Sequence, residues 1–394
     1  MNLSAIQSAL SAQKLDGWLF CDHHRRDPMA YAILGLGHHA MASRRWFYFL
    51  PAKGEPVKLA HRVEPRALES LPGRQEHYLA WTELHAKLKA MVAGSKRIAM
   101  QYSPDNNIPY IGLVDAGTIE LIRSFGPEIV TSADLVQQFE ATVGEEGYTS
   151  HAWAGDRVQK IKDETFEAMS KALKDGARVT ETELRDRIVR RFEEEGMTCE
   201  GESPIVGFND HPADPHFEPT QEKDYALKPG DTVLLDLWAR RVEPPGIYYD
   251  ITWCAFAGKQ PPAKYTEIFG VVRDARDAAV AFVSGKLESG TPVHGYEVDD
   301  ACRNIVKGAG YGPAFLHRTG HSIGTHVHGN GANIDNLETK DERLIVPGTC
   351  FSIEPGIYLP NESMAVRAEI NVFVRSSGKA EVYGAIQKDL VLLG

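Results

Sequence analysis

Four acidic residues interrupt segments whose other residues predict buried β-strands. Asp236 follows the apolar run Val-Leu-Leu, and Asp250 follows two tyrosines. Glu354 and Glu369 interrupt a later pair of such segments. An ionised carboxylate buried alone is strongly unfavourable, so each acid needs a nearby cation or must stay protonated. The separations of 14 and 15 residues allow each pair to lie on adjacent strands with its side chains meeting across them.

Two interpretations of these four acids are open. In one, each acid belongs to a separate salt bridge, and Arg367, two positions before Glu369 on the same strand face, neutralises that glutamate. In the other, two divalent cations balance four negative charges within one site. The matched arrangement in two pairs, together with a histidine-rich segment nearby in the sequence, favours the metal site.

The histidine-rich segment places four imidazoles within twelve residues, namely His317, His321, His326 and His328. The glycines between them disfavour a helix and allow the backbone to approach a ligand. The simplest division of roles makes one imidazole a metal ligand and others acid–base groups or substrate donors. We expect His326 to be structural, because a near neighbour of two working histidines is easily exposed.

A second candidate segment lies at 203–217, where prolines and a glycine predict a rigid loop. It contains His211 and His216. Composition alone does not distinguish either of them from an ordinary surface histidine.

The elements that would carry these residues repeat in the second part of the chain. Thr180 and Glu183 predict a capping box at a helix start, and Gly196 stands where a glycine commonly ends a helix. Further helices are predicted at 151–175, 264–287 and 297–307, and strands at 232–238, 248–258, 349–359 and 366–374. Helix-rich stretches followed by a pair of strands therefore occur twice.

The first part of the chain alternates helix and strand over shorter distances. A strand is predicted from Gly17, a hairpin at 45–61, a helix at 84–92 and a strand at 97–102. This alternation indicates a small α/β domain. Because 394 residues exceed what one core usually supports, we expect two domains, 1–147 and 148–394, divided at a polar stretch.

Composition narrows the class of protein. Apolar residues make up 43% of the chain and charged residues 25%, as in globular proteins. The net charge of −11 argues against nucleic acid or an anionic membrane as a partner. Five scattered cysteines and the absence of a signal-like N-terminus or a long apolar run indicate a cytoplasmic protein without a membrane span.

Four collinear motifs together resemble the pita-bread metallopeptidases, which include prolidase, Xaa-Pro aminopeptidase, methionine aminopeptidase and the metal-free creatinase. The motifs are the Asp236…Asp250 pair ending in Asp-Ile-Thr, the histidine run 317–328, Glu-Pro-Gly-Ile-Tyr at 354–358 and Val-Arg-Ala-Glu at 366–369. The resemblance implies an α+β protein with a pita-bread catalytic domain at 148–394. The N-terminal part is similar in length and alternation to the smaller α/β domain of prolidases.

The resemblance also implies roles for individual residues. It makes five residues the ligands of two divalent metal ions: Asp236, Asp250, His321, Glu354 and Glu369. Asp250 and Glu369 would bridge the ions, and Glu354 would double as the general acid/base. His216, His317 and His328 would hold the substrate, and His317 and His328 would also assist catalysis at the developing oxyanion. Arg367 would orient the ligands beside the substrate.

The activity implied is hydrolysis of the Xaa-Pro bond of dipeptides by a hydroxide shared between the metals. Mn²⁺ fits this oxygen-rich set best, with Co²⁺ or Zn²⁺ as alternatives. The substrate would be a small peptide with proline at its second position, and the family suggests a homodimer. The alternatives are an Xaa-Pro aminopeptidase acting on longer peptides, a metal-free amidinohydrolase and an inactive pita-bread protein that binds peptides. The segment between His328 and Glu354 offers Arg343 but no evident arginine for the substrate carboxylate, which leaves dipeptide specificity open.

Overall fold

The computed structural model describes residues 1–37, 43–215, 217–220 and 222–394. The chain forms two compact units, Met1–Glu140 and Ala141–Gly394. The division lies a few residues before the boundary placed after residue 147, because α6 (Gly144–Asp175) starts earlier than the predicted helix and runs through that boundary. Glu145 and Glu146 in its first turn favour this early start, since acidic side chains stabilise a helix N-terminus.

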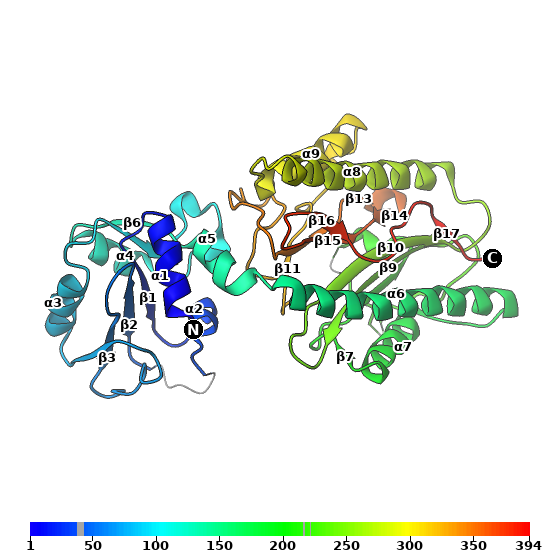
Figure 1. Cartoon of the computed structure of the whole chain (residues 1–394). Helices are drawn as coiled ribbons and strands as arrows, with labels where there is room; N and C mark the ends of the chain where they lie inside the picture. The colour runs from blue at the N-terminus through cyan, green and yellow to red at the C-terminus, as the bar shows by residue number, and fades with distance from the viewer. Residues whose placement is uncertain (38–42, 216, 221) are drawn as a thin grey trace. The chain divides into compact units, whose positions relative to one another are not determined.

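Within the described residues, the first unit is built on a six-stranded mixed sheet in the order β4-β3-β2-β1-β5-β6 (Figure 1). The predicted hairpin is present as two antiparallel strands, β2 and β3. The strands are β1 (Gly17–Asp22), β2 (Trp46–Pro51), β3 (Val57–His61), β4 (Arg74–Tyr78), β5 (Arg97–Met100) and β6 (Glu128–Thr131). The helices are α1 (Leu3–Ala12), α2 (Pro28–Leu34), α3 (Trp81–Met91), α4 (Ala116–Arg123) and α5 (Ala133–Val136).

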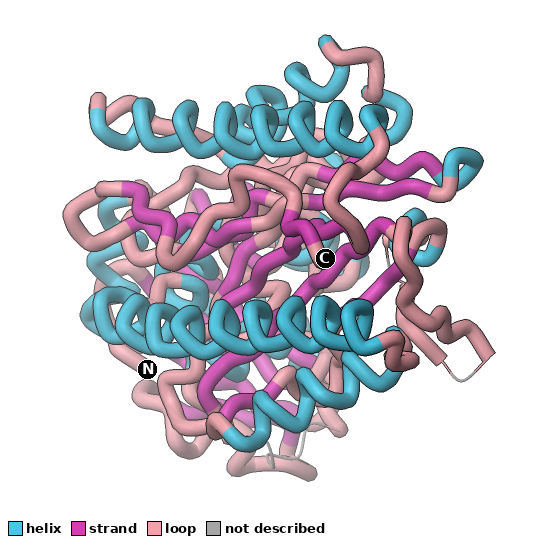
Figure 2. Tube along the Cα trace, turned by 90° about the vertical axis from the view of Figure 1, so that its right-hand side faces the viewer, coloured by secondary structure: helices cyan, strands magenta, loops and turns pink. Residues whose placement is uncertain are grey.

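The second unit has strands in the middle and helices on both sides (Figures 1 and 2). On one side α6 packs against β9 and β10, and on the other α8 packs against β12, β13 and β14. The helices of this unit are α6, α7 (Glu181–Glu194), α8 (Ala263–Glu288) and α9 (Gly295–Gly308). The longer strands are β9 (Thr232–Arg241), β10 (Tyr249–Phe256), β12 (Cys350–Ile353), β13 (Gly356–Leu359), β14 (Met364–Arg367) and β15 (Ile370–Val374), and the shorter ones are β7 (Met197–Thr198), β8 (Ile205–Phe208), β11 (Ser322–Ile323), β16 (Ala380–Val382) and β17 (Val391–Leu392).

Local sequence patterns predicted the start and the end of α7 in the second unit. The capping box is formed as predicted, with Thr180 accepting from the Glu183 backbone and Glu183 accepting from the Thr180 backbone. Gly196 follows the end of α7 with a φ of +71°, a conformation that glycine adopts without strain. Together α6 and α7 bury one apolar cluster against the outer face of β9 and β10.

The later strand pair differs from the prediction. The expected strand 349–359 is two strands, β12 and β13, separated at Glu354 and Pro355, and the expected strand 366–374 is divided into β14 and β15 at Ala368 and Glu369. Pro355 has no N–H to continue a ladder, which explains the first break. As a result β12 pairs with β15 while β13 pairs with β14, and the two glutamates stand where the pairing changes.

Candidate metal centre

The aspartates project from the continuous β9–β10 hairpin. In its register Asp236 pairs with Thr252, and Asp250 pairs with Trp238. Residues two apart on a strand share a face, so Asp236 and Trp238 point to the same side as Asp250 and Thr252. The two carboxylates therefore lie on one face of the hairpin, diagonal to each other rather than directly opposite.

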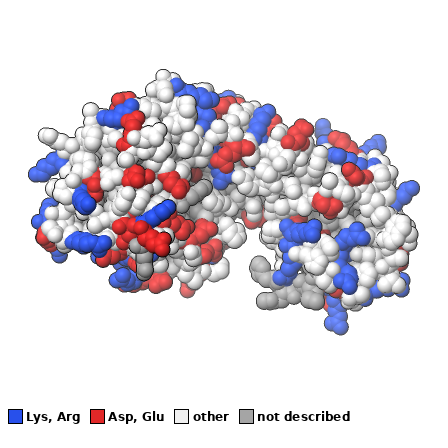
Figure 3. Space-filling model, turned by 180° about the vertical axis from the view of Figure 1, so that it is seen from behind, with Lys and Arg blue, Asp and Glu red and all other residues white. Residues whose placement is uncertain are grey.

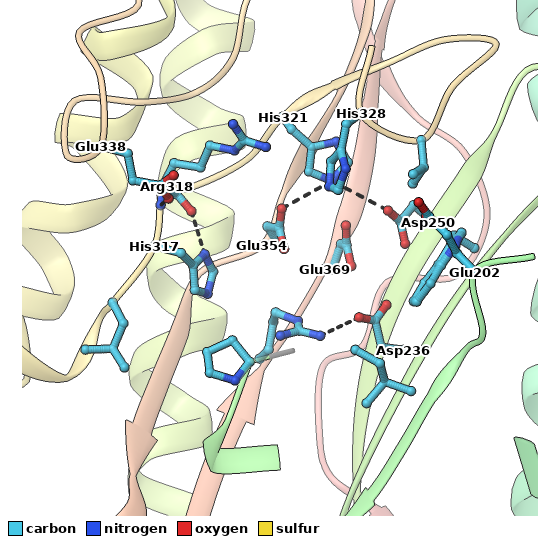
Figure 4. Close-up of a pocket in the computed structure, with 16 residues that line it drawn as sticks. Glu202, Asp236, Asp250, His317, Arg318, His321, His328, Glu338, Glu354 and Glu369 are labelled. Carbon is cyan, nitrogen blue, oxygen red and sulfur yellow. Dashed lines mark hydrogen bonds and ion pairs between the residues drawn. The ribbon is translucent and has the colours of Figure 1, made fainter. Parts of the chain in front are cut away.

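The glutamates are held at the strand breaks by backbone hydrogen bonds. The Glu354 N–H donates to the Thr319 carbonyl at 2.7 Å, and the Glu369 N–H donates to the Thr252 carbonyl at 3.1 Å. The first bond ties Glu354 to the histidine segment, and the second ties Glu369 to the aspartate hairpin. Both glutamates thus face the space that the aspartates and His321 surround (Figure 4).

One cavity of about 440 Å³ collects these groups. Its lining includes the five predicted ligands, Asp236, Asp250, His321, Glu354 and Glu369, and also His317, His328 and Arg367. Asp250, His321 and Glu369 are buried and offer ligand atoms that all lie within 4.8 Å of one another. Asp236 and Glu354 line the same cavity outside this closest group. The predicted ligands, which range from position 236 to position 369 of the sequence, are therefore neighbours in space.

The oxygens in this cavity lack the partners that buried carboxylates require. Oδ1 of Asp236, Oδ1 of Asp250 and Oε1 of Glu369 are shielded from solvent and have no hydrogen-bond partner among the described residues. Burial raises the pKa of all three side chains, and mutual repulsion between the carboxylates raises the pKa of Asp250 and Glu369 further. Such a set can be stabilised by protons or by cations.

The tautomer of His321 is compatible with a bound cation. Its Nδ1 lies 3.1 Å from the Ser322 carbonyl, which can only accept, so Nδ1 carries the hydrogen. Burial lowers the pKa of His321 to about 3, so the imidazole is neutral and Nε2 presents a lone pair. His321 Nε2 lies 3.6 Å from Asp250 Oδ2 and 3.4 Å from Glu354 Oε1, so its lone pair faces two carboxyl groups. A divalent cation fits this donor set of one imidazole and several carboxylates.

Arg367 does not neutralise Glu369 in the way that the salt-bridge interpretation requires. Its Nη2 forms an ion pair with Asp236, its Nε donates to the Thr252 hydroxyl at 3.1 Å, and its Nη1 donates to the Tyr358 hydroxyl at 3.0 Å. Thr252 in turn donates to Glu369 Oε2 at 2.8 Å. The guanidinium therefore holds one carboxylate directly and fixes a second through Thr252.

Tyr358 and Thr252 are the site residues that sequence reasoning missed. Both occur inside the quoted motifs, as the last residues of Glu-Pro-Gly-Ile-Tyr and Asp-Ile-Thr. Tyr358 lies 2.7 Å from His317 Nε2, and its burial raises its pKa to about 12. Because His317 Nδ1 donates to the Arg318 carbonyl at 2.7 Å, Nε2 accepts the phenolic hydrogen. A chain of hydrogen bonds thus runs from His317 through Tyr358 and Arg367 to Asp236.

The other histidines of the two candidate segments differ in their surroundings. The His328 ring lies edge-on to His321, with centroids 4.4 Å apart. His326 is exposed beside Glu200. His211 is stacked between Phe217 and Tyr225 and contacts Glu181, away from the cavity lining. The predicted substrate residue His216 falls outside the described residues.

A buried ion pair outside the cavity lining holds the histidine segment in position. Asp299 and Arg303 on α9 pair at 2.8 Å, and neither lines the cavity. Asp299 accepts from the backbone and the hydroxyl of Thr319, while Arg303 donates to the His317 carbonyl at 2.8 Å. Through Thr319 the pair also supports the backbone bond to Glu354.

Comparison with known proteins places this cavity in a family. The family model described as metallopeptidase family M24 matches residues 156–376, more than half of the chain. The chain belongs to metallopeptidase family M24. The residues matched by the family model include the four acids and the one histidine that are the predicted ligands. The resemblance noted in the sequence is thereby confirmed.

Relatives and solved structures agree with this membership. An uncharacterized peptidase of Staphylococcus aureus (strain MW2) is 30% identical over 234 residues, which are 57% of this chain and 60% of that protein. An uncharacterized peptidase of Staphylococcus saprophyticus is 29% identical over 270 residues, 67% of this chain and 69% of that protein. The chain thus spans about 60% of the length of the S. aureus relatives it matches.

Structural similarity extends over the whole chain. The dipeptidase PepE from Mycobacterium ulcerans superposes with a TM-score of 0.70 at 23% identity, covering 99% of this chain and 96% of that one. The prolidase from Thermococcus sibiricus gives a TM-score of 0.64 at 20% identity, covering 99% and 98%. The X-prolyl aminopeptidase from Caenorhabditis elegans, described as having a di-nuclear active site, gives 0.64 at 17% identity and covers 97% of this chain and 62% of that one. The predicted α+β architecture with a pita-bread domain is confirmed.

Two further features concern the charge of the surface and the hydropathy of the helices. On the face drawn in Figure 3, acidic side chains gather on the lower part of the second unit, while several basic side chains lie together on the first unit. No helix that the structure describes is long and apolar enough to cross a bilayer.

Proposed function

We propose that this M24 protein is a dinuclear-metal peptidase that hydrolyses the Xaa-Pro bond of dipeptides. The observation that carries the proposal is the convergence of five metal-binding side chains on one cavity in which three buried carboxylate oxygens have no partner among the described residues. A structural cluster would satisfy these oxygens with hydrogen bonds. A site that holds cations leaves them available.

Asp236, Asp250, His321, Glu354 and Glu369 would hold two divalent ions, with Mn²⁺ best suited to this oxygen-rich set. Bound ions in such a site acidify a water molecule and polarise the carbonyl of the scissile bond. Arg367 orients Asp236, and Thr252 orients Glu369. In each carboxylate one oxygen is fixed by a hydrogen bond, and the other oxygen has no partner among the described residues. Hydrogen bonds that other residues make to a metal ligand tune the geometry and basicity of that ligand.

Glu354 is placed to move the proton. It is the least buried of the four acids, and Ser352 donates to its Oε1 at 3.1 Å from one side. Its carboxylate can accept a proton from the attacking water and deliver it to the proline nitrogen as the bond breaks. The leaving nitrogen has to be protonated for the dipeptide to separate, so one carboxylate serves both steps.

His317 and His328 would contact the substrate around the scissile carbonyl, and His216 is carried over from the resemblance in the same role. His317 is neutral, because burial lowers its pKa to about 4. Its Nε2 accepts from Tyr358, so the Tyr358 hydroxyl and the His317 ring form one hydrogen-bonded unit beside the substrate. Because neither His317 nor Tyr358 has a hydrogen left to donate in this arrangement, His328 is the residue that would stabilise a developing oxyanion.

A proline residue suits the remaining lining. Ile205, Pro215, Leu316 and Val327 give the cavity an apolar part next to the charged groups. Proline has no N–H and a fixed ring, so apolar contacts rather than a hydrogen bond would select it. A cavity of about 440 Å³ is of the size that holds small ligands.

The test combines metal analysis with two substrates. Purified protein loaded with Mn²⁺ should contain about two ions per chain by elemental analysis and should hydrolyse Ala-Pro faster than Ala-Pro-Ala. Faster cleavage of the tripeptide would support an Xaa-Pro aminopeptidase instead. Metal binding without hydrolysis of either peptide would support the peptide-binding alternative. We also expect a homodimer, which light scattering during gel filtration would detect as twice the mass of one chain.

A further inference from the structure

Trp238 stands directly beside the proposed metal ligands. It lies two residues after Asp236 on β9, and its Cα pairs with that of Asp250 on β10. Its side chain therefore shares the face that carries both aspartates. It is half-buried and lines the cavity.

Packing alone holds the indole in place. Trp238 packs against the apolar cluster that includes Tyr248 and Ile323. Its Nε1 is shielded from solvent and has no hydrogen-bond partner among the residues that the structure describes. A buried tryptophan usually pairs this donor, so a ring kept here without such a bond contributes shape rather than hydrogen bonding. Truncating it breaks no described hydrogen bond.

Charge decides which end of a dipeptide meets this ring. Figure 4 places Glu202 near Asp250, whose strand partner is Trp238. On the opposite side Arg318 lies next to a second acid, Glu338, so the charges of these two side chains offset each other. The free ammonium of a dipeptide is therefore attracted toward Glu202, while the opposite side, where an arginine offsets a glutamate, repels the carboxylate less. The first residue of the substrate then lies next to Trp238.

We propose that Trp238 limits the size of the side chain that the first substrate residue can carry. The indole occupies the volume beside Asp250 that a branched or aromatic first side chain would need. Glycine, alanine and serine fit in front of the ring, while leucine and phenylalanine collide with it. This inference rests on the proposed Xaa-Pro dipeptidase activity and specifies its substrate class.

The test compares the first residue across variants. Wild type, Trp238→Ala and Trp238→Phe, each loaded with Mn²⁺, are assayed on Gly-Pro, Ala-Pro, Leu-Pro and Phe-Pro. We expect wild type to favour Gly-Pro and Ala-Pro. In Trp238→Ala the ratio of kcat/KM for Leu-Pro to that for Gly-Pro should rise by about tenfold or more, because a few methylene groups in a pocket discriminate by that amount. Trp238→Phe, which keeps an aromatic ring, should give an intermediate ratio and covers the case in which the alanine variant does not fold.

Trp253 provides a matched control. It is on the same hairpin and also has a buried Nε1 without a partner among the described residues, but it points to the opposite face, where the Lys162 ammonium lies 3.6 Å from its ring centroid. Trp253→Phe should leave the Leu-Pro to Gly-Pro ratio unchanged. A change as large as that of Trp238→Phe would overturn the assignment.

Binding without turnover gives a second measurement. In the Glu354→Gln background, isothermal titration with Leu-Pro should show about tenfold tighter binding when Trp238 is replaced by alanine, with little change for Gly-Pro. If wild type hydrolyses none of the dipeptides, the proposed function fails. If it hydrolyses them but Trp238→Ala leaves both the kcat/KM ratio and the Leu-Pro affinity unchanged, the inference about Trp238 alone is overturned.

Discussion

Two buried acidic regions of the second unit differ in how their carboxylates are paired. Around Asp299 every described carboxylate contact is a donor: Arg303 on two nitrogens and Thr319 through its backbone and hydroxyl. Asp341 is similarly enclosed by Arg343 and two backbone N–H groups. In the cavity, by contrast, the described ion pair between an arginine and the four acids is that of Arg367 with Asp236, and three oxygens lack partners among the described residues.

We interpret the difference as one between acids that stabilise the fold and acids that are proposed to hold cations. A buried ion pair with all its hydrogen bonds made is internally balanced, and its removal leaves a single buried charge. The cavity set carries an excess of negative charge that the chain alone does not balance. Folding tolerates this set because the surrounding hydrogen bonds fix it, and the same excess of negative charge would provide affinity for cations.

The largest expected effect is on turnover. Glu354→Gln keeps the shape of the side chain but removes its ability to exchange a proton, so kcat for an Xaa-Pro dipeptide should fall by about a thousandfold. The measurement is steady-state kinetics, with elemental analysis of the same sample to show that the metal content is retained. Near-normal turnover would remove Glu354 from the proton-transfer role, and loss of metal would assign the defect to binding.

Metal removal tests the charge excess itself. Chelation should lower the melting temperature, because ions at a thousand times their Kd stabilise the folded state by about 4 kcal/mol. Scanning calorimetry with and without chelator, at verified metal content, gives the shift. Trp238→Phe is expected to show the same shift as wild type, since Trp238 carries no ligand atom. An unchanged melting temperature after complete metal removal would contradict a shared site.

A pair of isosteric variants contrasts the two regions directly in metal-free protein. Asp299→Asn leaves Arg303 buried without its countercharge and should cost about 3–5 kcal/mol of unfolding free energy. Asp250→Asn removes a charge from a repelling set, so its cost should be near zero, or the variant should be more stable than wild type. Urea denaturation in the presence of chelator measures both. Equal destabilisation by the two variants would show that the regions do not differ in charge balance.

The sequence predicted the aspartate half of the site more completely than the glutamate half. Asp236 and Asp250 stand in uninterrupted apolar strands, where period-two alternation gives both the element and the face. Glu354 and Glu369 were expected inside continuous strands, yet they lie at breaks where β12 and β15 exchange partners with β13 and β14. Strand pairing across a break depends on contacts far apart in the sequence, and local patterns do not contain them.

Side-chain partners were harder to predict than positions. The motifs contained Thr252 and Tyr358, but a hydroxyl in a strand has no distinctive signature until its neighbours are known. The salt-bridge interpretation paired Arg367 with Glu369 because of their spacing, whereas the guanidinium reaches across to Asp236 on another strand. A long side chain can span several residues, so sequence spacing does not determine its partner.

The smallest effect concerns a buried histidine with no acid partner. His151 on α6 is buried, donates from Nδ1 to the Tyr248 carbonyl at 2.6 Å and has no partner at Nε2 among the described residues. Burial lowers its pKa to about 4, below the unfolded value near 6.5. The unfolded state therefore binds more protons between these values, so the stability that His151 contributes is complete above about pH 6.5 and is lost as the pH falls toward 4.

This loss should reach about 3 kcal/mol at and below pH 4. In His151→Gln, which can donate to the same carbonyl but does not titrate, that part of the acid dependence should disappear. The measurement is the unfolding free energy of metal-free wild type and variant between pH 7 and 4, taken as a difference so that titration of the cavity acids cancels. Parallel pH profiles would show that acid sensitivity arises from the unbalanced cavity and not from a buried neutral group outside it.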